Sequence, residues 1–212
     1  MVRRTKTDAL ATRNSLLDAA EHLFQARGVS RTSLNDIAVG AGTTRGAIYW
    51  HFKDKADLFN AMMERVTLPM EEALQSAGSQ LDGDPVAHLR AAMLHALHKT
   101  ATDEQTRRVF EVATHKVEYV PELSAVQARH LSVRNECLAQ TEHGLKQAVR
   151  RRGIALPIPV PAAALGLHVM VDGLIQNWLL DPQAFDLQQV GRQTIDTYLA
   201  GLGLADSAGN KG

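Results

Sequence analysis

Apolar residues recur at three- and four-residue steps along most of this chain, and no segment alternates polar and apolar residues in a stretch rich in Val, Ile and Thr. Leu16, Ala20, Leu23 and Phe24, for example, fall on one face of a helix. Glycine and proline divide the pattern into segments. The sequence therefore predicts an all-α fold of about nine helices, at residues 8–27, 33–40, 43–52, 54–75, 85–101, 103–119, 121–152, 161–181 and 186–203.

Two of these predicted helices are short and lie close together near the N-terminus. Ser33 and Asp36 stand at the spacing of a capping box, which marks the start of a helix. Gly42 interrupts that helix after about two turns, and Thr43 or Thr44 can cap the next one. Two short helices joined by a tight glycine-containing turn form a helix-turn-helix.

The distribution of charge supports a nucleic-acid partner, although the formal net charge is +0. Residues 1–53 contain eight basic and four acidic residues, so the remainder carries the compensating negative charge. A basic module on an acidic body can hold one end of the protein at a phosphate backbone. Cys137 is the single cysteine, which excludes an intrachain disulfide. With a polar N-terminus and no apolar run of about 20 residues, we expect a cytoplasmic protein without a membrane partner.

These signals predict a domain boundary after the second short helix. Residues 1–53 form the expected three-helix DNA-binding domain, and residues 54–204 form a larger helical domain that begins with a connecting helix at 54–75. A loop is expected at 76–85 and a proline-rich linker at 153–161. Residues 205–212 contain nothing to bury and are expected to be a flexible tail.

The predicted third helix has two different faces. Ile48 and Phe52 lie on the side expected to face the core. The opposite side carries an arginine, a glycine and two aromatic residues: Arg45, Gly46, Tyr49 and Trp50. Arginine has the donor fork that guanine O6 and N7 require, and a tyrosine hydroxyl can donate to a phosphate. Lys53 and Lys55, at the start of the next helix, can anchor a phosphate as well.

A larger pattern contains these residues: Thr32, Ile37, Ala38, Ala41, Gly42, Gly46, Tyr49, Phe52, Lys55 and Leu58. It resembles the helix-turn-helix signature of the TetR family of repressors. The segments MVRRTK, ATRNSLLDAAEHLFQARGVSRTSL and TRGAIYWHF are most similar to the multidrug-efflux repressors of the AcrR and TtgR type, and TRRVFEV, HKVEY, AVRRRG and VDGLIQNWLL extend the likeness along the chain. The resemblance implies DNA contacts by Thr32, Ser33, Thr44, Arg45, Tyr49, His51 and Lys55, with Thr43, Gly46 and Trp50 close by.

The resemblance further implies how such a protein works. A homodimer, joined through the last two helices, binds a palindromic operator in double-stranded DNA and represses a multidrug efflux operon. A small apolar or aromatic inducer, bound among the C-terminal helices, releases it. The candidate pocket residues are Phe110, Thr114, Arg134, Cys137, Thr141, His168, Asp172 and Gln176. Asp172 interrupts an apolar segment, and a buried carboxylate is costly unless paired, so it either meets a basic partner or orients the ligand.

Cys137 and the histidines could in principle support other functions. An enzyme, such as a thiol hydrolase using Cys137 with His168 or His130, would need an activated nucleophile in a recognisable setting, and the helical pattern around Cys137 offers none. We therefore expect no enzyme, and Cys137 as a small core residue rather than a redox sensor. His95 and His98 lack the further ligands of a metal site, so no metal or cofactor is expected. A regulator of a non-efflux pathway, or an activator, remains the alternative.

Overall fold

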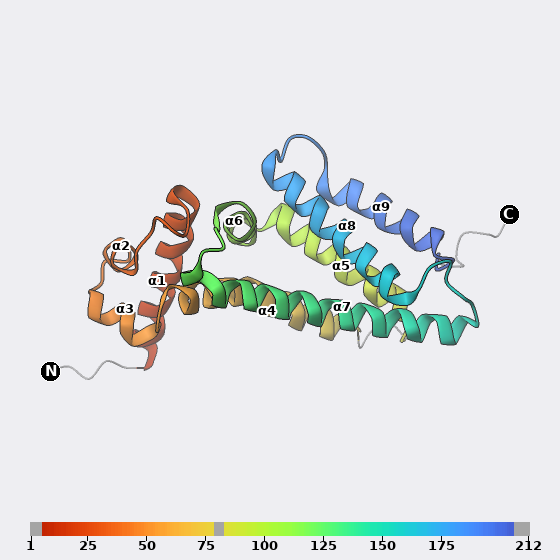
Figure 1. Cartoon of the computed structure of the whole chain (residues 1–212), viewed down its shortest axis with the longest axis horizontal. Helices are drawn as coiled ribbons and strands as arrows, with labels where there is room; N and C mark the ends of the chain where they lie inside the picture. The colour runs from red at the N-terminus through yellow and green to blue at the C-terminus, as the bar shows by residue number, and fades with distance from the viewer. Residues whose placement is uncertain (1–5, 79–82, 206–212) are drawn as a thin grey trace. The chain divides into compact units, whose positions relative to one another are not determined.

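The structure is a computed structural model that describes residues 6–78 and 83–205, and all its regular elements within these ranges are helical (Figure 1). The elements are α1 (Lys6–Arg27), α2 (Leu34–Gly40), α3 (Arg45–His51), α4 (Lys55–Gly78), α5 (Pro85–Thr102), α6 (Glu104–Glu111), a π-helix η1 (Val112–Lys116), a 3₁₀-helix η2 (Pro121–Leu123), α7 (Ser124–Arg152), α8 (Val160–Leu180) and α9 (Leu187–Gly201). The predicted all-α fold is confirmed.

Three local predictions were inaccurate. α4 continues to Gly78, so the first residues of the expected loop at 76–85 are helical, and residues 79–82 lie outside the described residues. The helix expected over 103–119 ends earlier, because α6 passes at Glu111 into a π-helix. Pro121 then disfavours a helical conformation at Val120, and α7 begins only after a short 3₁₀ turn. Most of the expected tail, residues 206–212, also lies outside the described residues.

The chain forms two compact units. Met1–Leu68 and Glu104–Leu131 make up the first, and Pro69–Asp103 and Ser132–Gly212 make up the second. The first unit therefore contains α6, η1 and the start of α7 in addition to the helix-turn-helix. Independent domains with a boundary at 53/54 stay a prediction.

The core of the first unit attaches the helix-turn-helix to the elements around it. Phe24 of α1 and Phe59 of α4 are fully buried, and their ring centroids are 6.2 Å apart. Ile37 of α2 and Ile48 of α3 belong to the same cluster. Burying side chains of this size contributes about 1.5–3 kcal/mol each. The position of α3 is therefore fixed by packing with α1 and α2.

In the second unit, glycines allow α5, α8 and α9 to approach closely. A Cβ on Gly191 of α9 would overlap the Leu97 side chain of α5, and a Cβ on Gly166 of α8 would overlap the Tyr198 hydroxyl. Arg90 of α5 also binds both carboxylate oxygens of Asp196, at 2.6 and 2.8 Å. On α8, this three-helix packing leaves one face exposed, which includes Leu165, Val169 and Leu180.

Candidate nucleic-acid interface

Side-chain caps define the ends of the two short helices. The Ser33 hydroxyl accepts a hydrogen bond from the Asp36 amide at 3.1 Å, and the Asp36 carboxylate accepts one from the Ser33 amide at 2.9 Å. The predicted capping box is therefore confirmed. The Ser33 hydroxyl also donates to the Asp36 carboxylate, and this bond, together with the one from the Ser33 amide, holds the pKa of Asp36 below its usual value. Thr44 caps α3 by accepting from the Ala47 amide at 3.2 Å. Gly42, with φ +65°, makes the left-handed turn between the helices.

The two faces of α3 differ as the sequence predicts. Ile48 and Phe52 are buried, whereas Tyr49 is 49% exposed and Trp50 is 72% exposed. Arg45 and Gly46 are exposed too. Two large aromatic side chains beside an arginine on one exposed helix face form a surface that can enter a DNA major groove.

Ring contacts order part of this face. The Arg45 guanidinium lies over the Tyr49 ring, 5.7 Å from the ring centroid, and the His51 ring stands edge-on to Trp50 at 4.6 Å. A guanidinium stacked on a ring keeps its in-plane N–H groups available for hydrogen bonds to a base. His51 itself is half-buried, which limits how far it can extend from the face.

Two of the predicted DNA contacts point into the protein. Thr32 is fully buried, and its hydroxyl donates to the Gly28 carbonyl at 2.8 Å. The half-buried Lys55 ammonium donates to three backbone carbonyls, those of Val29 at 2.8 Å, Thr32 at 3.0 Å and Ser30 at 3.2 Å. These three acceptors match the three donors of an ammonium group. The geometry gives both residues a role in holding the α1–α2 turn, and their contact with DNA stays a prediction.

The other predicted DNA contacts lie together from the start of α2 to the end of α3. Ser33 and Thr44 are exposed, and Thr43 is half-buried with its amide donating to the Ala38 carbonyl at 2.9 Å. Sequence reasoning missed Arg13 of α1, whose guanidinium lies 5.2 Å from the centroid of the Phe52 ring. Nothing in the local pattern pairs two residues so far apart in the chain.

The predicted ligand-binding residues are divided between the two units. Phe110 of α6 and Thr114 of η1 belong to the first unit and are half-buried. The second unit contains the others, on α7 and α8: Arg134, Cys137, Thr141, His168, Asp172 and Gln176. Their joint role in one ligand site stays a prediction.

Two expectations about these residues were wrong. Cys137 is exposed rather than a core residue, because it lies on the outward side of α7. Asp172 is exposed as well, and its partner is the Gln176 amide at 2.6 Å instead of a basic side chain. The apolar residues that flank Asp172 in sequence led to the expectation of burial, but α8 places it on a face that the chain itself does not cover.

Comparisons with known proteins assign the chain to a family. Residues 16–62 match the model "Bacterial regulatory proteins, tetR family", and residues 84–203 match the model "MAATS-type transcriptional repressor, C-terminal region". This chain belongs to the TetR family. The regulator AcrR of Shigella flexneri is 38% identical over 195 residues, which cover 92% of this chain and 91% of that protein. The regulator TtgR of Pseudomonas putida is 37% identical over 97% of this chain and 98% of its own length.

Solved structures agree with this assignment. NalD, described as the secondary repressor of the MexAB-OprM multidrug efflux pump in Pseudomonas aeruginosa, superposes with a TM-score of 0.84 at 35% identity, covering 92% of this chain and 98% of NalD. SmeT in complex with triclosan gives a TM-score of 0.77 at 33% identity and covers 90% of each chain.

The TetR-family chain exposes an apolar face on α8. Leu165, Val169 and Leu180 are 48%, 56% and 70% exposed. Beside this face, α8 and α9 line an open groove of about 350 Å³, whose residues are Met170, Gln193, Thr194, Thr197 and Tyr198. By length and composition alone, α8 could span a membrane, a criterion that core helices of soluble proteins also meet. Within residues 6–78 and 83–205, no three His, Cys, Asp or Glu side chains are grouped as metal ligands.

Proposed function

We propose that this protein is a ligand-responsive transcriptional repressor that binds a palindromic operator as a homodimer in the cytoplasm. Small apolar or aromatic compounds release it, and it controls a multidrug efflux operon. The observation that carries the proposal is the exposed face of α3, where Arg45, Tyr49 and Trp50 stand outside a capped and well-packed helix-turn-helix. Membership of the TetR family supports the same function.

In this proposal α3 reads the bases, and the residues around it anchor the backbone. Arg45 pairs with a guanine in the major groove, and Tyr49 donates its hydroxyl to a phosphate. The exposed Ser33, Thr44 and Lys53 lie where they can add backbone contacts. Residues 1–53 act as the DNA-binding domain, and residues 54–204 act in compound binding and dimerisation.

The dimer is proposed to form through α8 and α9. An apolar face as exposed as that of Leu165, Val169 and Leu180 is uncommon on a soluble monomer, and a second copy of the chain would cover it. The adjoining groove, which Tyr198 helps to line, can receive side chains from the partner. A two-fold dimer presents two copies of α3 to the two halves of a palindrome.

The efflux assignment rests on the relatives. NalD and SmeT are described as repressors of multidrug efflux pumps, and SmeT was solved with triclosan. Triclosan is therefore a suitable first probe for the predicted pocket residues of this chain. An Asp172→Ala variant should retain operator affinity and change the response to such compounds.

Operator selectivity tests the role of α3. The purified protein is titrated at fixed salt against DNA from upstream of its own gene and against scrambled DNA of equal length. Arg45→Ala should lose the preference for the upstream DNA and remain a dimer, whereas Arg31→Ala, an exposed arginine on the α1–α2 turn, should retain the preference. An Arg45→Ala variant that keeps wild-type selectivity would remove α3 from the reading of bases.

A further inference from the structure

A line of polar contacts joins α1 and the following turn to residues 105–118. The pairs, in order along α1, are Glu21 with Gln105 and Arg108, Gln25 with Glu111, Val29 with Lys116, and Ser30 with Glu118. The Gln25 amide donates to Glu111 at 2.8 Å, and the Val29 amide donates to the Lys116 carbonyl at 3.0 Å. All these residues belong to the first unit. The segment after α5 therefore follows α1 toward the helix-turn-helix.

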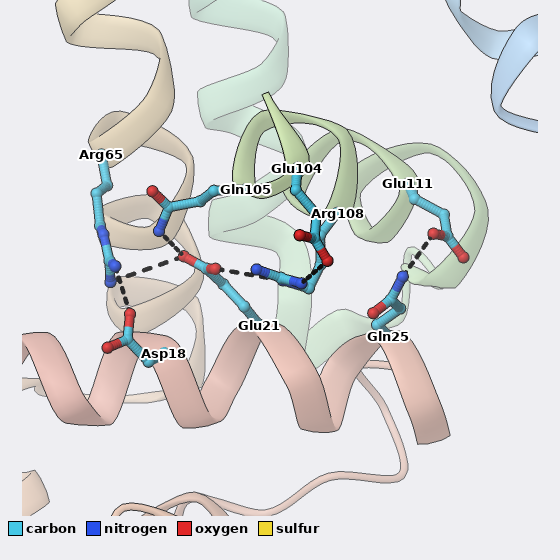
Figure 2. A network of polar contacts seen from close by, with 8 residues as sticks. All are labelled: Asp18, Glu21, Gln25, Arg65, Glu104, Gln105, Arg108 and Glu111. Carbon is cyan, nitrogen blue, oxygen red and sulfur yellow. Dashed lines mark hydrogen bonds and ion pairs between the residues drawn. The ribbon is translucent and has the colours of Figure 1, made fainter. Parts of the chain in front are cut away.

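Glu21 is the most buried charged member of this line. Its carboxylate is 1% exposed and meets side chains from two other helices, as Figure 2 shows. Gln105 of α6 donates to it at 2.9 Å. The guanidinium groups of Arg108 of α6 and Arg65 of α4 lie 3.6 and 3.7 Å away. One carboxylate thus joins α1, α4 and α6.

Ionisation of this carboxylate does not by itself favour folding. Burial raises the pKa of Glu21, and the lowering effects of Gln105, Arg65 and Arg108 do not fully offset it. The folded state therefore disfavours the ionised side chain relative to the neutral one. Buried ionic groups that do not stabilise a fold can instead fix one arrangement of its elements.

We propose that Glu21 is a positioning residue for operator binding: it holds α1 in one place against α4 and α6, and the packing of α1 on α2 and α3 transmits that position to the exposed face of α3. The proposal rests on the proposed function, because it concerns affinity for an operator. It also gives residues 105–118, which are distant in sequence from α3, control over DNA binding. Phe110 and Thr114, two of the predicted ligand-binding residues, belong to that segment.

Glu21→Gln tests the proposal, because it removes the charge and keeps the shape. Arg65 also pairs with Asp18, and Arg108 also pairs with Glu104, so neither guanidinium loses its last carboxylate and the variant should fold. The matched control is Glu64→Gln, which removes the same charge from an ion pair with Arg129 at 3.2 Å in the same unit.

Affinity for the upstream DNA should fall by about tenfold in Glu21→Gln relative to Glu64→Gln, with equal melting temperatures and an unchanged dependence on salt. The direction of this change in affinity is informative. Removing a negative charge by itself strengthens binding to phosphate, so a weaker affinity points to a lost structural contact. Glu111→Gln, on the more accessible second pair, should weaken binding by a smaller factor of about threefold. Affinities of Glu21→Gln and Glu111→Gln within about twofold of the control would overturn the proposal.

Amide hydrogen exchange on the free protein separates this inference from the proposed function. If the wild-type protein binds no operator, the proposed function fails, and the exchange data still decide the role of Glu21. Faster exchange in both α1 and α6 of Glu21→Gln than of Glu64→Gln would support a positioning role. Exchange that is equal in the two variants would overturn it.

Discussion

Replacing Lys55 by methionine should weaken the helix-turn-helix without removing a phosphate contact. The ammonium donates to the carbonyls of Val29, Ser30 and Thr32, and so joins the start of α4 to the turn between α1 and α2. Methionine keeps an unbranched stem but has no donor. The three carbonyls then lose their hydrogen-bond donor. Water cannot readily take its place at Val29 and Thr32, because both residues are buried.

The size of the effect follows from these three bonds. A hydrogen bond to a charged group contributes about 1.5–3 kcal/mol net. The contribution is smaller for Lys55, because the side chain is half-exposed and water also solvates its ammonium group. We expect a total loss of about 2–4 kcal/mol. For a chain of this length, that corresponds to a fall in melting temperature of roughly 4–16 °C.

Thermal unfolding and the salt dependence of operator binding together distinguish this role from a DNA contact. A phosphate contact contributes about 0.9 to the slope of log affinity against log salt, so losing one per subunit of a dimer lowers the slope by about 2. Lys55→Met should lower the melting temperature and leave the slope unchanged. Lys53→Met, at an exposed lysine two residues earlier, should leave the melting temperature unchanged and lower the slope. A Lys55→Met variant of wild-type stability with a slope lower by about 2 would refute the reasoning.

Three further substitutions have expected outcomes. Gly191→Ala places a Cβ on Leu97 and should cost about 1–3 kcal/mol, whereas Gly201→Ala, with open space around it, should be neutral or stabilising; equal melting temperatures would contradict the packing described for α5 and α9. Ser33→Ala should cost about 1 kcal/mol and raise the pKa of Asp36 toward its usual value, so an unshifted carboxylate titration by NMR would exclude the capping box. Burial lowers the pKa of His130 from 6.5, so below that pH the unfolded chain takes up a proton that the folded chain does not, and the stability of the fold decreases. His130→Gln should therefore lose less stability than the wild type between about pH 7.5 and 5.5, and thermal unfolding measures the difference.

The parts of the fold that depend on local signals were predictable from the sequence. The start of α2 follows from the spacing of Ser33 and Asp36, and the buried and exposed faces of α3 follow from helical periodicity. The π-helix at Val112–Lys116 has no such signal, because the residues that form it are compatible with an ordinary helix. The start of α2 was therefore predictable from a side-chain cap, whereas the end of α6 was missed because the helix changes its winding there.

The site was less predictable, because its decisive contacts join residues far apart in the chain. Lys55 matches a family signature whose position suggests a DNA contact, and only the folded chain brings three carbonyls to its ammonium. In the sequence, Glu21 looks like an ordinary polar residue of a surface helix. Its burial becomes visible only in the folded chain, where side chains of α4 and α6 surround it. Asp172 shows the opposite error, since an apolar sequence context does not determine which face of a helix its own chain covers.

The most direct test of the proposed function is a salt-controlled titration of the purified protein against DNA from upstream of its own gene, with and without triclosan. The account predicts a folded dimer that prefers this DNA to a scrambled sequence, and an operator affinity that falls when triclosan binds, since a compound releases a repressor only if the two states bind it differently. Binding no tighter than to scrambled DNA would contradict an operator at its own gene. Selective binding that neither triclosan nor any other apolar or aromatic compound weakens would contradict a ligand-responsive repressor.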